Sequence, residues 1–304
     1  MPNNDSSQYL STVQAASLLS VSVSTVKRWV DDGVLPAHRT AGGHRKLLRA
    51  EVLALARQGD LPHGNLAVLG GSSEKDRTED LETIAVDLWK ALRDGQGDEV
   101  RAIIRSSYVS GVAVETLADK IVAPAMRKLG HDWETSRIDV WQEHRGTQLC
   151  AATLYDLKED LETRAEKNRP VAVGGAPEGD PYFLPTLLAQ YVLLDAGWEA
   201  VKLGPNTPLT SLAKAVKDLR PRLLWLSVSY LENREAFIEG FKDLYRVAER
   251  QGVAVAAGGQ ALQESLRSAI PYTTYGDGLS HLAAFARTLH PRPKRPRRGR
   301  PPVL

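Results

Sequence analysis

The sequence predicts a multidomain protein of mixed α and α/β class, with a small helical module, a four-helix bundle and a doubly wound parallel sheet. Its 304 residues, 42% of them hydrophobic, are enough for two or three packed domains of roughly 100–200 residues each. Apolar residues recur at helical spacing up to about residue 166, whereas beyond residue 169 short apolar strands alternate with helical stretches. This change of period separates an all-helical part of the chain from an α/β part.

The first 58 residues predict two short helices. Ser11 and Thr12 are suitable N-cap residues for the first helix. Its apolar face consists of Val13, Ala15, Ala16, Leu18 and Leu19. The second helix is predicted to begin at Ser24–Thr25 and to end before Gly33 and Pro36. Its inward-facing residues are Val26, Trp29 and Val30, and its outward-facing residues are Thr25, Lys27 and Arg28.

A hairpin and a third helix are predicted next. Residues 38–47 place basic and polar side chains on both sides of Gly42–Gly43, and a helix is expected from about Arg49 to Arg57. In this order the segment resembles the MerR-type winged helix-turn-helix. The resemblance implies dimers on double-stranded operator DNA, with the second helix in the major groove and the hairpin as a wing against the backbone. The residues it assigns to base edges or phosphates are Ser24, Thr25, Lys27, Arg28, Arg39, His44, Arg45 and Lys46.

Residues 59–76 are expected to form a linker, because they contain most of the local glycine, serine and proline. Residues 77–166 predict the four-helix bundle, and Pro124 is the only proline between Glu79 and Glu166. Apolar residues recur there at helical spacing in four groups, which begin at Leu81, Val100, Leu117 and Trp141.

Residues 167–290 predict the α/β domain. Strands are expected at 171–173, 199–203, 223–229 and 253–257, and helices at 184–194, 209–216, 235–250 and 280–289. Such alternation predicts a parallel sheet covered by helices, with a ligand site at the carboxyl ends of the strands.

Two groups of residues resemble a known family of regulators. The segment Pro177–Pro185, with Ser227-Val228-Ser229 and Gly258-Gly259, resembles the cobalamin-binding domain. In the bundle, the spacing from Trp133 to Glu143-His144 matches the Trp-x9-Glu-His element of the CarH and CarA group of light-responsive repressors. The order of the three domains is also that group's order, and the resemblance covers residues 9–290. It implies an adenosylcobalamin-like cofactor contacted by Trp133, Glu143, His144, Asp180, Tyr182, Ser227, Ser229, Gly258 and Gly259.

One position departs from the family pattern. Where the family has Asp-x-His, whose imidazole binds cobalt from below, this chain has Asp180-Pro181-Tyr182. A phenol, with a reference pKa near about 10, must lose a proton before it binds a metal well. Three interpretations follow: cobalamin bound with its own base or a water below, a haem or bilin with Tyr182 or His144 as a metal ligand, or a domain without ligand.

Basic charge is concentrated at the two ends of the chain. The net charge is +2, but residues 1–58 carry seven Lys/Arg against four Asp/Glu, and residues 287–304 carry seven Lys/Arg and no acid. Clustered basic side chains bind polyanions by releasing counterions. The tail, residues 291–304, contains Arg298-Gly299-Arg300-Pro301 and resembles the AT-hook, which implies that Arg298 and Arg300 enter a narrow A·T-rich minor groove.

The composition excludes several other classes of protein. No apolar run approaches the roughly 18–20 residues of a membrane span, and residues 1–10 do not have the layout of a secretory signal, so we expect a cytoplasmic protein with no membrane partner. The single cysteine, Cys150, excludes an internal disulfide and a cysteine-rich zinc site and is expected to be a buried thiol.

The sequence as a whole predicts a sequence-specific transcriptional repressor rather than an enzyme. Its operator affinity is expected to depend on cobalamin or a related tetrapyrrole, with light as a candidate input and a dimer or tetramer as the assembly. The alternatives are a ligand-free dimerising or partner-regulated DNA binder, a haem- or bilin-sensing regulator, and a corrinoid methyl-transfer protein. The winged helix and the missing lower histidine argue against the methyl-transfer protein.

Overall fold

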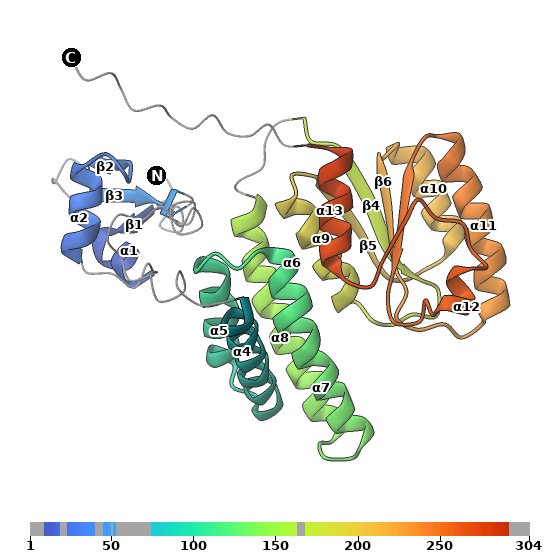
Figure 1. Cartoon of the computed structure of the whole chain (residues 1–304), viewed down its shortest axis with the longest axis horizontal. Helices are drawn as coiled ribbons and strands as arrows, with labels where there is room; N and C mark the ends of the chain where they lie inside the picture. Colours follow the sequence, from blue (N-terminus) through green and yellow to red (C-terminus); the bar gives the residue numbers. More distant parts are fainter. Residues whose placement is uncertain are drawn as a thin grey trace, which may run out of the picture. The chain divides into compact units, whose positions relative to one another are not determined.

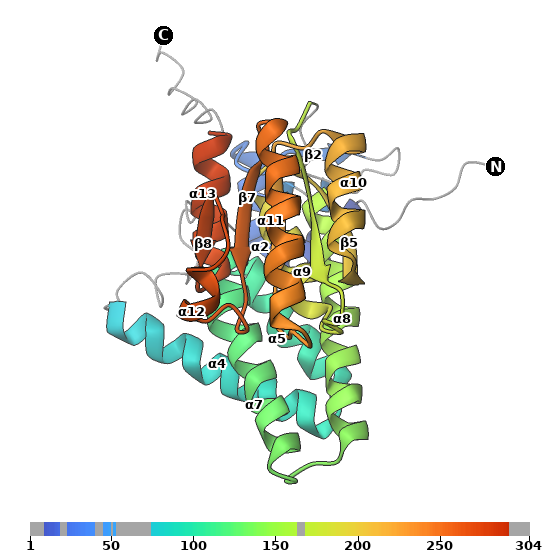
Figure 2. The same ribbon diagram turned by 90° about the vertical axis from the view of Figure 1, so that its right-hand side faces the viewer.

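The computed structural model describes residues 9–18, 23–39, 45–49, 51–52, 74–162 and 168–291. The chain divides into two compact units, residues 1–164 and 165–304. Figures 1 and 2 show the elements of both units from two sides. Among the described residues, no helix is long and apolar enough to cross a membrane.

The N-terminal module of the first unit packs two helices on a small antiparallel sheet. Its elements are β1 (Tyr9–Ser11), α1 (Thr12–Leu18), α2 (Val23–Asp31), β2 (Ala37–Arg39) and β3 (Arg45–Leu48). The strand order is β1-β3-β2, with Tyr9 opposite Leu48 and His38 opposite Lys46. Arg49 and residues 51–52 are helical, and the rest of the expected third helix lies outside the described residues. The core consists of Ala15, Ala16, Val26, Trp29, Leu35, Leu47 and Val52, joined by Val109 of the bundle.

Helix α1 begins with a capping box. The backbone N–H of Ser11 donates to Gln14 Oε1 at 2.9 Å, and the N–H of Gln14 donates to Ser11 Oγ at 3.2 Å. Two expectations were wrong here: Val13 is 62% exposed rather than part of the apolar face, and strand β1 was not predicted. Both errors have one cause. Pairing of β1 with β3 fixes where α1 begins and therefore how the helix is oriented. In this orientation Ala15 and Ala16 point into the core and Val13 points to solvent.

The bundle of the first unit has four helical segments in the range 74–162. They are α4 (Glu74–Asp94), α5 (Gly97–Val109), a continuous segment of α6 (Val114–Thr116), η2 (Leu117–Val122) and α7 (Ala123–Glu134), and α8 (Val140–Glu162). The π-helical turn η2 is explained by Pro124. Proline has no N–H for the carbonyl of Lys120, and the N–H of Ala123 instead reaches the carbonyl of Ala118.

The start of the fourth apolar group was predicted wrongly. Trp141 was expected in the bundle core and is 56% exposed. It lies in the first turn of α8, before the buried face of that helix begins at Gly146 and continues through Cys150 and Leu154.

The second unit is a five-stranded parallel sheet covered by helices on both faces. Its strands are β4 (Val171–Pro177), β5 (Glu199–Thr207), β6 (Leu223–Ser227), β7 (Ala254–Gly258) and β8 (Thr274–Gly276). Helices α9 (Leu184–Asp195) and α13 (Leu279–Leu289) cover one face, and α10 (Leu209–Leu219) and α11 (Arg234–Arg250) cover the other (Figures 1 and 2). The predicted α/β class is confirmed, whereas the short helix α12 (Glu264–Arg267) and strand β8 were not predicted.

The strand order β5-β4-β6-β7-β8 identifies the crevice of this sheet. The chain moves outward in one direction from β4 to β5 and then returns to the other side of β4 with β6. In open α/β sheets, ligands bind outside the carboxyl ends of the strands where the winding reverses. In this unit that point lies between the loops that follow β4 and β6.

Candidate DNA-binding surface and ligand site

Helix α2 presents basic side chains on its outer face. Lys27 and Arg28 are exposed, as is Ser24, while Val26 and Trp29 are buried in the core of the module. The 3.6-residue period of the helix produces this division. The side chains of Thr25 and Arg39, and the whole of His44, lie outside the described residues.

Arg45 joins the wing strand β3 to the end of α2. Its Nη2 lies 2.6 Å from Asp31 Oδ1, and its Nη1 lies 3.3 Å from both Asp31 Oδ2 and the carbonyl oxygen of Lys27. A bidentate pair of this kind fixes geometry as well as charge. The sequence assigned Arg45 mainly to phosphate, and the structure adds a contact with Asp31 and Lys27 that depends on the fold. Lys46 follows it in β3 and is partly buried.

In the second unit, Asp180 clamps the two loops that flank the crevice. Asp180 Oδ2 accepts hydrogen bonds from the backbone N–H groups of Ser229, at 2.6 Å, and Tyr230, at 3.2 Å. Asp180 Oδ1 accepts from the N–H of Tyr182 at 3.0 Å. Burial raises the pKa of Asp180, and the three backbone N–H groups oppose the shift because they stabilise the carboxylate.

The carboxyl end of strand β5 is tied to this clamp by Asn206. Its Oδ1 accepts from the N–H of Gly179 at 2.8 Å, and its own N–H donates to the carbonyl of Asp180 at 2.9 Å. Asn206 has a φ of 49°, in the left-handed region that asparagine tolerates better than most residues. The sequence placed Asn206 and Tyr230 in loops at the carboxyl ends of the predicted strands but did not single them out as site residues.

The Gly258-Gly259 turn brings the β7 loop against the β6 loop. The N–H of Val228 donates to the carbonyl of Gly258 at 2.7 Å. Gly259 has a φ of 121°, and a Cβ at this position would lie 2.2 Å from the carbonyl oxygen of Val228. Glycine is therefore required here by backbone packing.

Around this rigid edge, aromatic side chains are exposed. Tyr182 and Tyr230 are 49% and 48% exposed, whereas Ser227 is buried at the end of β6 and Ser229 is half-buried. The edge therefore combines a fixed backbone with two phenol rings that are available to a ligand.

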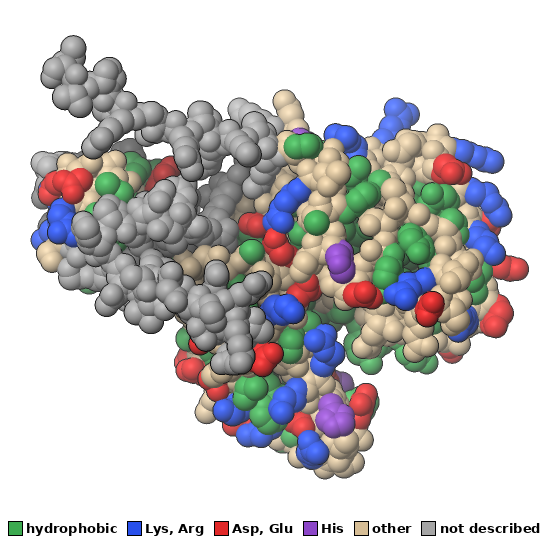
Figure 3. Space-filling model, viewed as in Figure 1, with side chains coloured by type: hydrophobic (Ala, Val, Ile, Leu, Met, Phe, Trp, Pro, Cys, Tyr) green, Lys and Arg blue, Asp and Glu red, His purple; other side chains and the backbone are tan. Residues whose placement is uncertain are grey.

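The bundle exposes a second aromatic surface, which we call the α7–α8 surface: Trp133, Val140, Trp141 and His144. Trp133 is 44% exposed at the end of α7, and Arg145 lies 5.0 Å from the ring centre of Trp141. Glu143 accepts a hydrogen bond from Thr147 Oγ1 at 2.8 Å, and its Oε2 lies 3.8 Å from His144 Nε2. Histidine side chains are visible at the surface of the bundle in Figure 3.

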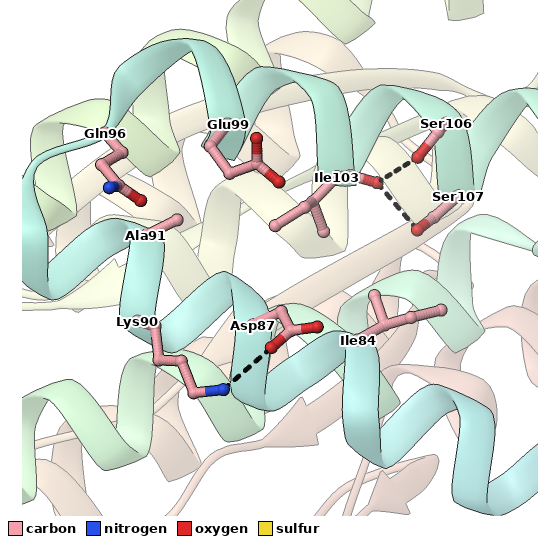
Figure 4. A pocket seen from close by; sticks show the side chains of 9 residues that line it. All are labelled: Ile84, Asp87, Lys90, Ala91, Gln96, Glu99, Ile103, Ser106 and Ser107. Carbon is pink, nitrogen blue, oxygen red and sulfur yellow. Dashed lines mark hydrogen bonds and ion pairs between the residues drawn. The ribbon is translucent and has the colours of Figure 1, made fainter.

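Two hollows of about 320 Å³ each lie elsewhere in the bundle and contain none of the predicted site residues. One lies between α4 and α5 and is lined by Ile84, Asp87, Lys90, Ala91, Gln96, Glu99, Ile103, Ser106 and Ser107 (Figure 4). In the other, the buried carboxylate of Asp132 accepts hydrogen bonds from Trp89 Nε1 at 2.8 Å and from Arg137 Nη1 at 3.3 Å. These two contacts explain why a charged side chain is buried there. In the described part of the chain, no group of three His, Cys, Asp or Glu side chains could hold a metal ion.

Comparison with known families bears on the classes of protein that the sequence left open. Residues 9–66 match the family of helix-turn-helix domains, and residues 84–158 match the family of B12 binding domains. The two matches follow one another along the chain, and both lie within the first unit. The B12 binding match, residues 84–158, lies within the bundle.

Two curated relatives match this chain over much of their length. The chain is 24% identical over 266 residues to the HTH-type transcriptional repressor CarH of Myxococcus xanthus, covering 81% of this chain and 87% of CarH. It is 26% identical over 189 residues to the HTH-type transcriptional repressor CarA of the same organism, covering 62% of each chain. The match therefore spans less than two thirds of the length of CarA.

A solved structure supports the fold. The monomethylamine corrinoid protein of Methanosarcina barkeri superposes with a TM-score of 0.57 at 18% identity, covering 68% of this chain and 98% of that protein. The predicted fold class and the resemblance to the CarH and CarA group are confirmed by these matches. The domain boundaries, the individual site residues and the response to light stay predictions.

Proposed function

We propose that this chain is a transcriptional repressor that binds operator DNA through α2 and the wing, and whose DNA affinity is controlled by a corrinoid. One observation carries the proposal: a helix-turn-helix module with an exposed basic helix and a B12 binding domain occur in the same chain. The CarA and CarH relatives, both described as HTH-type transcriptional repressors, support the regulatory role over an enzymatic one.

On the DNA side, Lys27 and Arg28 are the side chains that α2 offers to the major groove. Both are exposed, and the buried Trp29 beside them holds the helix in the module. Arg45, held by Asp31, sets the angle of the wing strand relative to α2. Phosphate contacts from these cations give affinity and orientation, while contacts to base edges give specificity.

On the ligand side, each unit by itself exposes groups that suit a corrinoid. The α7–α8 surface offers exposed indole and imidazole rings, and the sheet edge offers a backbone frame locked by Asp180 and Asn206. A frame that is already fixed loses little conformational entropy when a large planar molecule binds. When bound, a corrinoid would supply a cobalt centre that can exchange a ligand.

Regulation follows from linkage. A ligand that binds one assembly of the protein more tightly than another shifts the population toward that assembly, by its differential affinity and no more. Helix-turn-helix modules bind paired half-sites, so a change in the number of associated chains changes operator affinity.

The test is operator binding by fluorescence anisotropy, using DNA from upstream of the chain's own gene. We expect Arg28→Ala to weaken binding by about 1–3 kcal/mol if Arg28 contacts a base. The matched control is Arg101→Ala, which removes an exposed arginine of α5 that pairs with Asp98 and Asp156. Equal losses in the two variants would contradict the assignment of α2.

The corrinoid half is tested with the same duplex. Adenosylcobalamin is added in the dark and the sample is then illuminated, while gel filtration reports the assembly. A change in assembly and in operator affinity on addition supports corrinoid control, and reversal by illumination extends it to light. If operator affinity is unchanged by cobalamins but changes with haemin, a haem sensor is favoured. If neither compound changes operator affinity, a ligand-free domain is favoured.

A further inference from the structure

The carboxyl edge of the parallel sheet has few side chains that could ligate a metal that prefers nitrogen. The loops after β4, β5, β6, β7 and β8 contain neither histidine nor cysteine. Of the seven histidines in the chain, two lie within residues 168–291, namely His281 and His290. The single cysteine, Cys150, is buried in α8.

His290 lies at the wrong end of the sheet. It follows α13, and its ring packs edge-on against Trp198 with the ring centres 6.1 Å apart. Trp198 immediately precedes β5, so this pair marks the amino-terminal edge of the sheet. His290 is therefore remote from the loops that form the crevice.

His281 lies at the carboxyl edge, but its hydrogen bonding does not suit a metal ligand. Its Nδ1 accepts a hydrogen bond from the backbone N–H of Asp277 at 3.2 Å. A neutral imidazole with an accepting Nδ1 carries its hydrogen on Nε2, so neither nitrogen has a lone pair to give. Metal-binding histidines show the opposite pattern, in which the second nitrogen donates. Its helix also follows β8, the outermost strand, three strands away from β4.

The two side chains of the Asp180-Pro181-Tyr182 segment do not supply the missing ligand. Both carboxylate oxygens of Asp180 are used by backbone N–H groups of two loops. Tyr182 is half-exposed and presents a phenol, which must lose its proton before it binds cobalt well.

We propose that this chain binds its corrinoid in the base-on form: the nitrogen on the lower face of the cobalt comes from the ligand's own nucleotide base, and no protein side chain ligates that face. Asp180 is then a positioning residue that holds the β4 and β6 loops together. The inference rests on the proposed corrinoid-controlled function and adds a ligand requirement to it: a corrinoid without a nucleotide base should be bound poorly.

The first test compares hydroxocobalamin with diaquocobinamide, which has the same ring but no nucleotide base. Full-length protein is incubated with each compound, and retention is measured after gel filtration. We expect cobalamin to be retained and cobinamide to bind at least about tenfold more weakly. Equal retention of the two would overturn the base-on proposal, whereas retention of neither would overturn the corrinoid-dependent function itself.

The second test identifies the nitrogen directly. Protein labelled uniformly with ¹⁵N is loaded with unlabelled cobalamin, which is reduced to the Co(II) state for electron paramagnetic resonance. Coordination by the ligand's own ¹⁴N base splits each cobalt line into a triplet, and we expect that triplet. A doublet would reveal a protein nitrogen, and lines without nitrogen splitting would reveal an oxygen ligand or none; either result overturns the proposal.

Two variants make the second test specific. Tyr182→Phe removes the phenol oxygen and should leave the triplet unchanged. Tyr182→His places an imidazole at the family's ligand position and should convert the triplet into a doublet in ¹⁵N protein. A triplet that persists in Tyr182→His would overturn the assignment of residue 182 to the lower face. Circular dichroism of each variant confirms that it is folded.

Discussion

At the scale of single residues, Asp180 is the most consequential side chain of the sheet edge. Asparagine has nearly the same shape but replaces one acceptor oxygen by an NH₂ group, so it can accept from the N–H groups of Ser229 and Tyr230 or from that of Tyr182, but not from both sides. Leaving buried donors unsatisfied costs about 1–3 kcal/mol. We expect Asp180→Asn to speed amide exchange in peptides covering residues 180–184 or 227–232, measured by mass spectrometry. Glu178→Gln, an exposed neighbour in the same loop, should leave exchange unchanged; similar exchange in both variants would contradict the clamp.

The clamp also shows what the sequence could not reveal. The cofactor resemblance singled out Asp180, but its partners lie 49 and 50 residues further along the chain. Backbone N–H groups carry no residue-type signal, so only the folded sheet could identify Ser229 and Tyr230 as donors. The same reasoning applies to Arg45, whose pairing with Asp31 depends on how β3 packs against α2.

Cys150 gives a prediction about pH. Burial raises the pKa of its thiol to about 12. Because the thiolate is the reactive form, the native protein should react with a maleimide at pH 8 at least about a hundredfold more slowly than the urea-unfolded protein. Above about pH 9 the unfolded thiol loses its proton while the native thiol keeps it, so the free energy of unfolding should fall as pH rises. Rapid labelling of native protein would contradict the buried position.

At the scale of secondary structure, two glycines of the bundle form a matched pair. Gly130 lies inside α7, and a Cβ added there would meet nothing within 4 Å. Glycine in a helix interior is less favourable than alanine by about 0.5–1 kcal/mol, so Gly130→Ala should stabilise the bundle by that amount. In Gly146→Ala, the Cβ would lie 2.7 Å from Leu129 Cδ2 and 3.1 Å from the carbonyl oxygen of Leu92, so that variant should be destabilised. Thermal unfolding measures both, and shifts of the same sign would contradict the packing of α8.

The helices and strands that the sequence predicted correctly are long and have a clear periodic pattern of apolar residues. Helices α9 and α11 and the buried strand β6 were found within a few residues of their bounds, because burial imposes a recognisable pattern. Strand β8 was missed because it is three residues long, lies at the edge of the sheet and contains no apolar run. Trp141 was misplaced because an aromatic residue at helical spacing looks the same in sequence whether the core or a ligand covers it.

At the scale of the whole molecule, the basic tail should add affinity that salt removes. Residues 292–304 lie outside the described residues and contain six Lys/Arg. Deleting them should reduce the salt dependence of DNA binding by about 0.9 in log Kd against log salt for each phosphate that the tail neutralises. Replacing Arg298 and Arg300 by lysine keeps the charge, so it should preserve the salt dependence while weakening the preference for A·T-rich duplexes. An unchanged salt dependence after deletion would remove the tail from DNA binding.

Operator DNA and corrinoid must affect each other equally if one chain couples them. If saturating cobalamin changes the Kd for operator by some factor, operator must change the Kd for cobalamin by the same factor, because both routes around the binding cycle have the same free energy. A tenfold factor corresponds to about 1.4 kcal/mol. We expect equal factors different from one, from anisotropy of labelled operator with and without hydroxocobalamin and from cobalamin titrations with and without operator. The Arg28→Ala protein is the control, because operator at a concentration that it does not bind should leave its cobalamin affinity unchanged. Factors of one in both titrations would show that operator binding and cobalamin binding are not coupled in this chain.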